Sequence, residues 1–373
     1  MVMEAIGELK QIHIYGRTTM TDGAVNLFWS ASGLDFLFNG SKISMCYEAD
    51  YERIEPWISV LIDGAWIIRM PAQKGIHTIT LLQGLEAKSS HRIQILKDVQ
   101  AMADDAAHRL SIKSLTHDGR LSSPPPFDLR MEFIGDSITS GEGCVGARME
   151  TEWISAFFSS VPTYARLTKE ALNADYRIIS QSGWGIRSAW NNDPHGTLVS
   201  YYDQVCGIAQ DIASDGGCLH SHERYGFSAW PADVVVVNLG TNDEGAFHGP
   251  AYKDPLTEVV YQNKLLPDGR YDPEDVARIV EAQKKFLKKI RRNNPEAIII
   301  WCYGMSGNLF STFLEKGVWE YCHESGDRYA FYLELPNMTE DTIGSRQHPG
   351  PVCHREASET LTGFISKLER KNR

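Results

Sequence analysis

The hydrophobic positions of the first 125 residues form short runs separated by turn-forming residues. Several runs alternate apolar and polar side chains, as half-buried strands do. Asp63-Gly64 lies between two runs and is a hairpin signal. Repeated short strands predict a jelly-roll-like β-sandwich over residues 1–125. The runs that predict its strands are residues 26–29, 34–38, 43–47, 57–62, 66–70, 76–82 and 92–96.

A proline-rich segment, residues 122–126 (SSPPP), separates this part from one with a different pattern. Three consecutive prolines cannot continue a helix or a central strand, so we place a linker there and a second domain over residues 126–373. Strand-length apolar runs alternate in it with helical patterns, the clearest from Pro273 to Arg292 behind the N-cap Asp272. This alternation predicts a flavodoxin-like three-layer α/β domain with a parallel sheet of about five strands. The strands are predicted at residues 131–134, 177–179, 234–237, 298–301 and 331–335, and further helices at 163–172 and 355–368.

The charge of the chain narrows the classes of partner. Its 373 residues carry a formal net charge of -11, which argues against nucleic acid or an anionic membrane as a partner. The first residues lack the pattern of a secretory signal, and no run of roughly 18 apolar residues predicts a membrane span. We expect a small-molecule or oligosaccharide partner, and a homo-oligomer remains open.

The seven cysteines are odd in number and widely spaced, with no CxxC pair. Reduced thiols in the cytoplasm are the simplest interpretation of this usage. Cys322-His323 and Cys353-His354 come nearest to a metal-ligand pattern, but zinc spacing is absent. We therefore expect no metal site.

Polar residues follow the ends of four predicted strands. The blocks are GDSITSG at residues 135–141, SQSGWG at 180–185, GTND at 240–243 and QHPG at 347–350. Ligands of a parallel sheet bind beyond the carboxyl ends of its strands, so we expect these blocks to lie at one edge.

Together the blocks supply the parts of a serine esterase site. Ser137 is the candidate nucleophile, and His348 is the base that takes its proton. The N–H of Ser137, the N–H of Gly183 and the amide of Asn242 are candidate donors to an oxyanion. Each block alone is also a common turn or N-cap, and only their joint order indicates a site.

The four blocks, in this order, resemble those of the SGNH (GDSL-type) hydrolases over residues 130–370. The resemblance implies that Ser137 is the nucleophile, that His348 is the base, and that Gly183 and Asn242 are oxyanion donors. It also implies a three-layer α/β fold, ester hydrolysis through an acyl-enzyme, and no cofactor. A β-sandwich directly before the serine block is similar to carbohydrate esterase family two, whose members remove acetyl groups from sugars.

One position departs from the superfamily pattern. Most SGNH enzymes have an aspartate three residues before the histidine, and Ser345 stands there in this chain. Asp341 or Glu340 in the same loop can orient His348 instead, a backbone carbonyl can hold its Nδ1–H, or the site is impaired. Some members of family two resemble the second case and work with a Ser-His dyad, so the resemblance implies that the loss of the aspartate need not mean inactivity.

Several residues near the blocks are candidates for substrate contact. Trp184 directly follows Gly183 and is the best placed of the tryptophans to stack on a sugar. Asp136 and Asp243 are further candidates, although such residues more commonly brace their turns. A cytoplasmic enzyme would meet short acetylated oligosaccharides rather than intact polysaccharide.

Two rival functions remain open. A lipase or thioesterase of the same fold would need a long apolar acyl groove. A carbohydrate-binding protein with weakened catalysis would accommodate the loss of the aspartate at position 345. The sandwich then binds glycan, or it only packs over the second domain and shapes its cleft.

Overall fold

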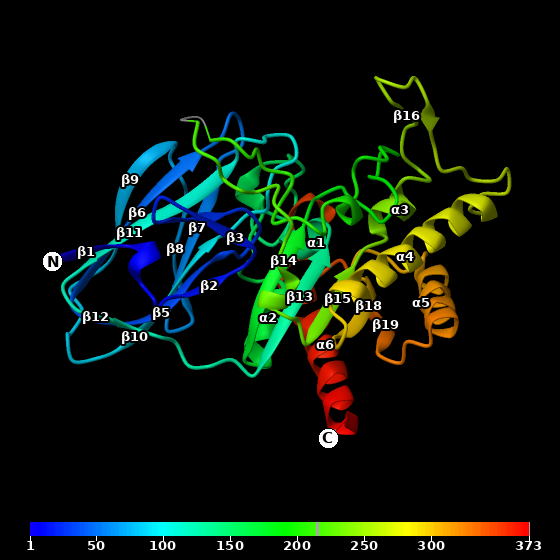
Figure 1. Ribbon diagram of the computed structural model, residues 1–373. Coiled ribbons are helices and arrows are strands. Elements are labelled where there is room, and N and C mark those ends of the chain that lie inside the picture. The colour runs from blue at the N-terminus through cyan, green and yellow to red at the C-terminus, as the bar shows by residue number, and fades with distance from the viewer. Residues whose placement is uncertain (214–215, 373) are drawn as a thin grey trace. The chain divides into compact units, whose positions relative to one another are not determined.

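The computed structural model describes residues 1–213 and 216–372 (Figure 1). The chain forms two compact units, and each is assembled from separate stretches of sequence. The first unit contains Met1–Phe127, Trp153–Val161 and Asp203–Tyr225. The second contains Asp128–Glu152, Pro162–Tyr202 and Gly226–Arg373. The sequence predicts a single division between residues 125 and 126, whereas two short later segments belong with the first unit.

The first unit is a β-sandwich of two six-stranded antiparallel sheets, which confirms the predicted fold of this part. Its first sheet has the order β3-β4-β11-β6-β9, with β1 also paired to β11, and its second has the order β12-β5-β10-β7-β8, with β2 paired to β5. The strands of the first sheet are β1 (Val2–Ala5), β3 (Thr18–Thr21), β4 (Ala24–Leu27), β6 (Lys42–Asp50), β9 (Gly75–Gln83) and β11 (Arg109–His117). Those of the second are β2 (His13–Tyr15), β5 (Gly33–Asn39), β7 (Trp57–Ile62), β8 (Ala65–Pro71), β10 (His91–Lys97) and β12 (Arg120–Ser122).

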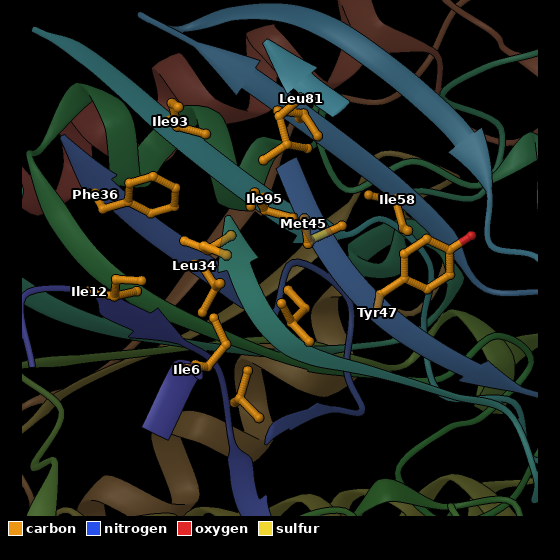
Figure 2. Packing of buried hydrophobic residues seen from close by; sticks show 14 of the residues in the cluster. Ile6, Ile12, Leu34, Phe36, Met45, Tyr47, Ile58, Leu81, Ile93 and Ile95 are labelled. Carbon is orange, nitrogen blue, oxygen red and sulfur yellow. The ribbon is translucent and has the colours of Figure 1, made fainter. Parts of the chain in front are cut away.

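The core of the sandwich lies between the inward faces of these sheets (Figure 2). Leu34 and Ile93 from the second sheet belong to the same buried cluster as Met45 and Tyr47 from the first, and all four have almost no exposed surface. Such burial removes each side chain from water, a gain of about 1.5–3 kcal/mol per large apolar residue. Every predicted strand run overlaps an observed strand.

Local geometry explains why the sequence pattern predicts the hairpin turn of this unit and misses strand β11. Asp63 and Gly64 both have positive φ, 51° and 83°, as the tight turn between β7 and β8 requires. β11 was not predicted, because a register shift between Ile112 and Ser114 breaks its alternation of apolar and polar positions.

The second unit is a five-stranded parallel sheet covered by helices, as predicted. Its order, β14-β13-β15-β18-β19, is that of a flavodoxin-like fold. Helix α2 packs against α6, and α4 packs against α5, which gives the two helical layers (Figure 1).

The strands are β13 (Leu129–Gly135), β14 (Ala174–Ser180), β15 (Val234–Asn238), β18 (Ile298–Gly304) and β19 (Ala330–Leu335), and a separate pair is β16 (Tyr252–Lys253) and β17 (Val260–Tyr261). The helices are α1 (Ser137–Ser140), α2 (Tyr164–Ala171), α3 (Thr241–Gly245), α4 (Pro273–Asn293), α5 (Ser311–Ser325) and α6 (Pro351–Asn372). Short 3-10 helices are η1 (Ile6–Glu8), η2 (Ser155–Phe157), η3 (Leu198–Ser200), η4 (Phe227–Ala229) and η5 (Ser345–Gln347).

Helix α4 begins as its sequence predicts, since Asp272 accepts a hydrogen bond from the N–H of Glu274 at 2.8 Å. Helix α5 was not predicted, and Gly317 in its middle lowers its helix propensity. The structure uses that glycine for close packing, because a Cβ there would lie 2.0 Å from Oε1 of Gln283 in α4.

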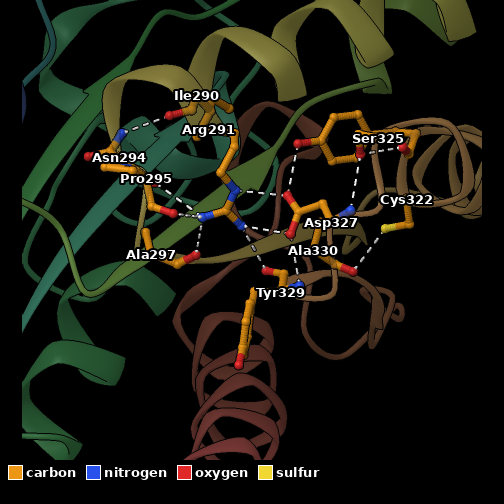
Figure 3. Close-up of polar contacts among 11 residues, drawn as sticks. Ile290, Arg291, Asn294, Pro295, Ala297, Cys322, Ser325, Asp327, Tyr329 and Ala330 are labelled. Atoms are coloured by element: carbon orange, nitrogen blue, oxygen red, sulfur yellow. Dashed lines mark hydrogen bonds and ion pairs between the residues drawn. The ribbon is translucent and has the colours of Figure 1, made fainter.

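The last turn of α4 is tied to the segment after α5 by Arg291 (Figure 3). Its guanidinium donates to both oxygens of Asp327, at 2.8 and 3.1 Å. The hydroxyl of Tyr321 donates to the same carboxylate. Arg291 also donates to the carbonyls of Asn294, Pro295 and Ala297. These bonds satisfy carbonyls beyond the helix end and position the start of β18.

Candidate active site

Ser137 stands at the turn between β13 and α1. Asp136 caps this short helix, and its Oδ1 accepts a hydrogen bond from the N–H of Ile138 at 3.0 Å. Gly141, with φ 82°, ends the helix in the left-handed conformation that glycine tolerates. The serine is largely buried, with 6% of its surface exposed. The turn therefore fixes its side chain at the carboxyl edge of the sheet.

His348 reaches this serine from the loop before α6. Its Nε2 lies 2.9 Å from Oγ of Ser137, although 211 positions separate the two residues in sequence. The structure thus brings together the two residues that the sequence predicts as nucleophile and base.

The other ring nitrogen of His348 contacts a backbone carbonyl. Nδ1 lies 2.8 Å from the carbonyl oxygen of Arg346, which can only accept, so Nδ1 carries the proton. Nε2 is then free to accept the hydroxyl proton of Ser137. Of the alternatives left open by the sequence, the carbonyl occupies this position, and the side chains of Glu340 and Asp341 are exposed.

Ser345, in the position of the usual aspartate, has a different partner. Its hydroxyl donates to the carbonyl of Val145 at 2.8 Å, and the residue is fully buried. Arg346 and Gln347 follow with φ of 52° and 55°, values that residues other than glycine rarely adopt. This unusual backbone turns the carbonyl of Arg346 toward the ring of His348.

Asn242 lies in α3, between the serine turn and the glycine block. Its Nδ2 donates to the carbonyl of Trp184 at 3.0 Å and to Oδ2 of Asp136 at 3.3 Å. Gly183 precedes Trp184 and has φ 79°. The amide of Asn242 and the loop that carries Gly183 are therefore both beside the turn of Ser137.

Asp136 and Asp243 are buried, with 1% and 0% of their surface exposed. Burial raises the pKa of Asp136 to about 7, and the charges of Asp243 and Glu142 add to the effect. Burial likewise raises the pKa of Asp243 to about 6, against the backbone N–H groups of Ile186 and Arg187 that it accepts at 2.7 and 2.8 Å. Both carboxyls brace turns, and their burial leaves almost no surface for the substrate contact considered from the sequence.

Glu142 is a buried residue of the site that the sequence analysis did not single out. Its Oε1 accepts a hydrogen bond from Nε of Arg346 at 2.6 Å, and its Oε2 accepts one from the hydroxyl of Ser182 at 2.5 Å. Oε2 also lies 3.8 Å from Nε2 of His348. The signal in the sequence is an acidic residue directly after the last glycine of the nucleophile block.

Two tryptophans lie beside the glycine block. Trp184 is half-buried, with its ring centroid 5.3 Å from that of Tyr201. Trp190 is 52% exposed, and a Cβ on Gly183 would lie 3.2 Å from its ring. Trp190 is therefore the more open of the two aromatic faces.

Both Cys-His pairs take part in packing and hydrogen bonds. The thiol of Cys322 donates to the carbonyl of Ala330, and the ring of His323 stacks on that of Trp319. His354 is buried and stacks on Tyr164, whose N–H it accepts at 3.1 Å. The thiol of Cys353 points to the carbonyl of Pro336. Among the described residues, no group of three or more His, Cys, Asp or Glu side chains is arranged to hold a metal ion. No helix within the described ranges is both long and apolar enough to cross a membrane.

Comparison with known proteins places the chain in a family. Residues 14–125 match the family model described as the N-terminal part of carbohydrate esterase 2. An acetyl xylan esterase from the rumen bacterium Butyrivibrio proteoclasticus is 36% identical, and the match covers 99% of this chain and 98% of that one with a TM-score of 0.96. A family two carbohydrate esterase from Clostridium thermocellum, solved in complex with cellohexaose, is 26% identical, with coverage of 96% and 99% and a TM-score of 0.78.

A cellulase/esterase of Acetivibrio thermocellus is 26% identical over 347 residues, which is 90% of this chain. The chain spans only 37% of the length of that relative. The similarity to the Butyrivibrio enzyme extends over both units and nearly the full length of each chain. The chain therefore belongs to family two of the carbohydrate esterases, within the SGNH hydrolase superfamily.

Proposed function

We propose that this protein is a serine esterase that removes acetyl groups from acetylated sugars or oligosaccharides. The observation that carries the proposal is the 2.9 Å contact between Oγ of Ser137 and Nε2 of His348, at the carboxyl edge of the parallel sheet. A hydroxyl needs such a base to become a nucleophile at neutral pH.

In the first step, His348 accepts the proton of Ser137 as Oγ attacks the acetyl carbonyl carbon. The carbonyl of Arg346 keeps the proton of the free imidazole on Nδ1, so that the lone pair of Nε2 faces Oγ. The N–H groups of Ser137 and Gly183 are the proposed donors for the negative charge on the tetrahedral intermediate. The amide of Asn242 joins them by exchanging its longer hydrogen bond, to Oδ2 of Asp136, for one to the oxyanion.

In the second step, the tetrahedral intermediate collapses. His348 gives its proton to the sugar oxygen, the bond from that oxygen to the acetyl carbon breaks, and the acetyl group stays on Ser137. Water then attacks the acetyl-enzyme with His348 as base, and acetate leaves as Ser137 recovers its proton.

The substrate class follows from the relatives and from the aromatic residues at the site. One relative is an acetyl xylan esterase, and another was solved with cellohexaose. We therefore expect acetylated xylan fragments or similar oligosaccharides to be substrates. The exposed ring of Trp190 and the half-buried ring of Trp184 are the proposed surfaces for a sugar.

One apolar groove of this unit is lined by residues outside the four catalytic blocks. The groove has a volume of about 1110 Å³ and lies between α4, α5 and the segment before α4. Its lining includes Tyr271, Val276, Val280 and Phe313, and its described residues all fall between positions 248 and 320. None of these lining residues belongs to the four catalytic blocks, so this groove gives no support to the lipase or thioesterase alternative.

A cytoplasmic location stays a prediction from the cysteine usage. All seven cysteines are free thiols, and Cys144, Cys206, Cys302 and Cys353 are buried. In that compartment the substrates would be short imported oligosaccharides. Fractionation of the source cells, followed by detection of the protein, tests this location.

The proposed activity is tested by acetate release from an aryl acetate and from acetylated xylo-oligosaccharides. Ser137→Ala removes the nucleophile, and kcat/KM should fall by at least about 10³-fold. Ser140→Ala, in the same helix with its hydroxyl on Ser180, is the matched control and should retain activity. Equal rates in wild type and Ser137→Ala would contradict the assignment.

The same assay separates the rival functions. A series of aryl esters from acetate to octanoate should show kcat/KM falling with acyl length. A rise with length favours a lipase or thioesterase, and sugar binding without acetate release favours a carbohydrate-binding protein.

A further inference from the structure

Glu142 contacts the serine turn, the glycine block and the histidine loop through its two carboxylate oxygens and its backbone. Its N–H donates to the carbonyl of Ser137 at 3.0 Å. One oxygen accepts from Ser182, which precedes the proposed oxyanion residue Gly183, and the other accepts from Arg346. With only 1% of its side chain exposed, this carboxylate is shielded from water, and its interactions are correspondingly strong.

Arg346 connects this carboxylate to the orientation of His348. Its Nε donates to Glu142, its Nη1 donates to the carbonyl of Thr151 at 2.8 Å, and its own N–H donates to the carbonyl of Glu150 at 2.7 Å. Its backbone, at φ 52° and ψ 30°, is in the left-handed region that L-residues avoid. The carbonyl that accepts Nδ1–H of His348 therefore depends on a conformation that these side-chain contacts maintain.

Glu142 also faces the base directly. Its Oε2 lies 3.8 Å from Nε2 of His348, the atom that becomes protonated when Ser137 attacks. A carboxylate at this distance stabilises the imidazolium by Coulomb attraction. An aspartate at position 345 would act on Nδ1, whereas Glu142 acts near Nε2 and, through Arg346, on the partner of Nδ1.

We propose that Glu142 is a positioning residue that takes over the role of the aspartate replaced by Ser345. It orients the imidazole through Arg346 and balances the charge that forms on His348. This inference rests on the proposed esterase function. It assigns the orienting role to Glu142, the residue that directly follows the nucleophile block.

The charged and titratable groups around His348 determine in which direction the pH profile of each variant should shift. Glu142 places a negative charge near the ring of His348, and Arg346 places a positive charge on Glu142. His354 lies on the helix that follows, and burial together with the charge of His348 lowers its pKa to about 3, so it stays neutral. Asp136 is another titratable group beside the serine, with its pKa raised to about 7 by burial.

The test uses Glu142→Gln and Arg346→Gln in the full chain, assayed on an aryl acetate across pH. Each variant should lose at least about tenfold in kcat at its pH optimum, with KM changed less than threefold. The reason is that each substitution weakens an interaction that stabilises the transition state rather than substrate binding. In Glu142→Gln the unbalanced guanidinium opposes protonation of His348, so the acidic limb of the kcat/KM profile should move to lower pH. In Arg346→Gln the unbalanced carboxylate favours protonation, so that limb should move to higher pH.

Three controls keep the outcome interpretable. Asp341→Asn removes an exposed carboxylate from the His348 loop and should leave kcat and the pH profile unchanged. Asp136→Asn removes the other titratable carboxyl, and the opposite shifts of the two test variants should persist in its background. Thermal unfolding of each variant should remain cooperative.

The inference is overturned if Glu142→Gln keeps kcat within twofold of wild type, or if both variants shift the acidic limb in the same direction. Arg346→Lys gives a second comparison, since it keeps the charge and should leave the limb closer to wild type than Arg346→Gln. Loss of activity in Ser137→Ala with wild-type activity in Glu142→Gln would refute this inference alone. Full activity in Ser137→Ala would refute the proposed function itself.

Discussion

At the scale of single residues, the decisive feature is the proton on Nδ1 of His348. A backbone carbonyl accepts it, so the Ser-His pair is oriented without an aspartate at position 345. Ser345 is fully buried, and its hydroxyl donates to the carbonyl of Val145. The position of the usual aspartate is therefore already used for a different hydrogen bond. The local hydrogen bonds of this loop are consistent with a dyad.

Restoring the usual aspartate by Ser345→Asp should therefore fail to raise activity. The new carboxylate would be buried against a carbonyl oxygen, and two acceptors facing each other without a donor cost about 1–3 kcal/mol or more. We expect a lower Tm and a kcat/KM no higher than that of wild type.

Ser345→Ala is the matched control, because it loses a single hydrogen bond, about 1 kcal/mol. Thermal unfolding and aryl acetate hydrolysis of the three proteins decide the matter. A rise in kcat/KM of Ser345→Asp with unchanged Tm would show that the position accepts an orienting carboxylate.

At the scale of elements, the turn after α1 and the loop before α6 fit closely together. Gly143 has φ 82°, and a Cβ there would lie 2.5 Å from Cβ of His348 and 2.8 Å from the carbonyl oxygen of Ser345. A Cβ on Gly344 would in turn lie 2.1 Å from the carbonyl oxygen of Gly143. The distance from serine to histidine is thus set by two glycine backbones in contact.

Gly143→Ala should displace the histidine loop and lower kcat/KM by about tenfold or more, since small displacements of a catalytic group have large effects. The matched control is Gly269→Ala, where φ is also 82° but nothing lies within 4 Å of the added Cβ. Both variants carry the backbone strain of a positive φ, about 1–2 kcal/mol.

Steady-state kinetics and thermal unfolding of the two glycine variants separate strain from displacement. We expect both variants to lose a similar amount of Tm and only Gly143→Ala to lose kcat/KM. Equal activity in both variants would show that the loop tolerates the movement.

At the scale of the whole molecule, the first unit depends on segments that come later in the chain. Asp98 is fully buried and accepts hydrogen bonds from the hydroxyls of Ser159 and Ser160, both at 3.0 Å, and from Arg69. The indole N–H of the buried Trp29 donates to the carbonyl of Val205 at 2.8 Å. The sandwich is therefore completed by residues 153–161 and 203–225.

A fragment of residues 1–127 should consequently not fold stably. Each buried polar group left without a partner costs about 1–3 kcal/mol, and a domain has only about 5–15 kcal/mol of net stability. We expect an aggregated product or one without a cooperative thermal transition, measured by circular dichroism beside the full chain. A cooperative transition close to that of the full chain would contradict this dependence.

Much of the fold could be predicted because its signals are local. The alternating runs of the sandwich, the hairpin turn at Asp63-Gly64 and the capped helix α4 all depend on residues near one another in sequence. Where the local signal was broken, by the register shift in β11 or by Gly317 in α5, the element was missed. The order of the catalytic blocks indicated their common edge, because parallel strands align their carboxyl ends.

The sequence by itself determined the two architectures, the family and the pairing of Ser137 with His348 as candidates. Only the tertiary structure decided the partner of Nδ1, the central position of Glu142 and the membership of the later segments in the sandwich. The physical reason is the separation of the interacting groups, which is 204 positions for Glu142 and Arg346. Hydrogen bonds over such separations follow from packing and burial, and no local pattern in the sequence records them.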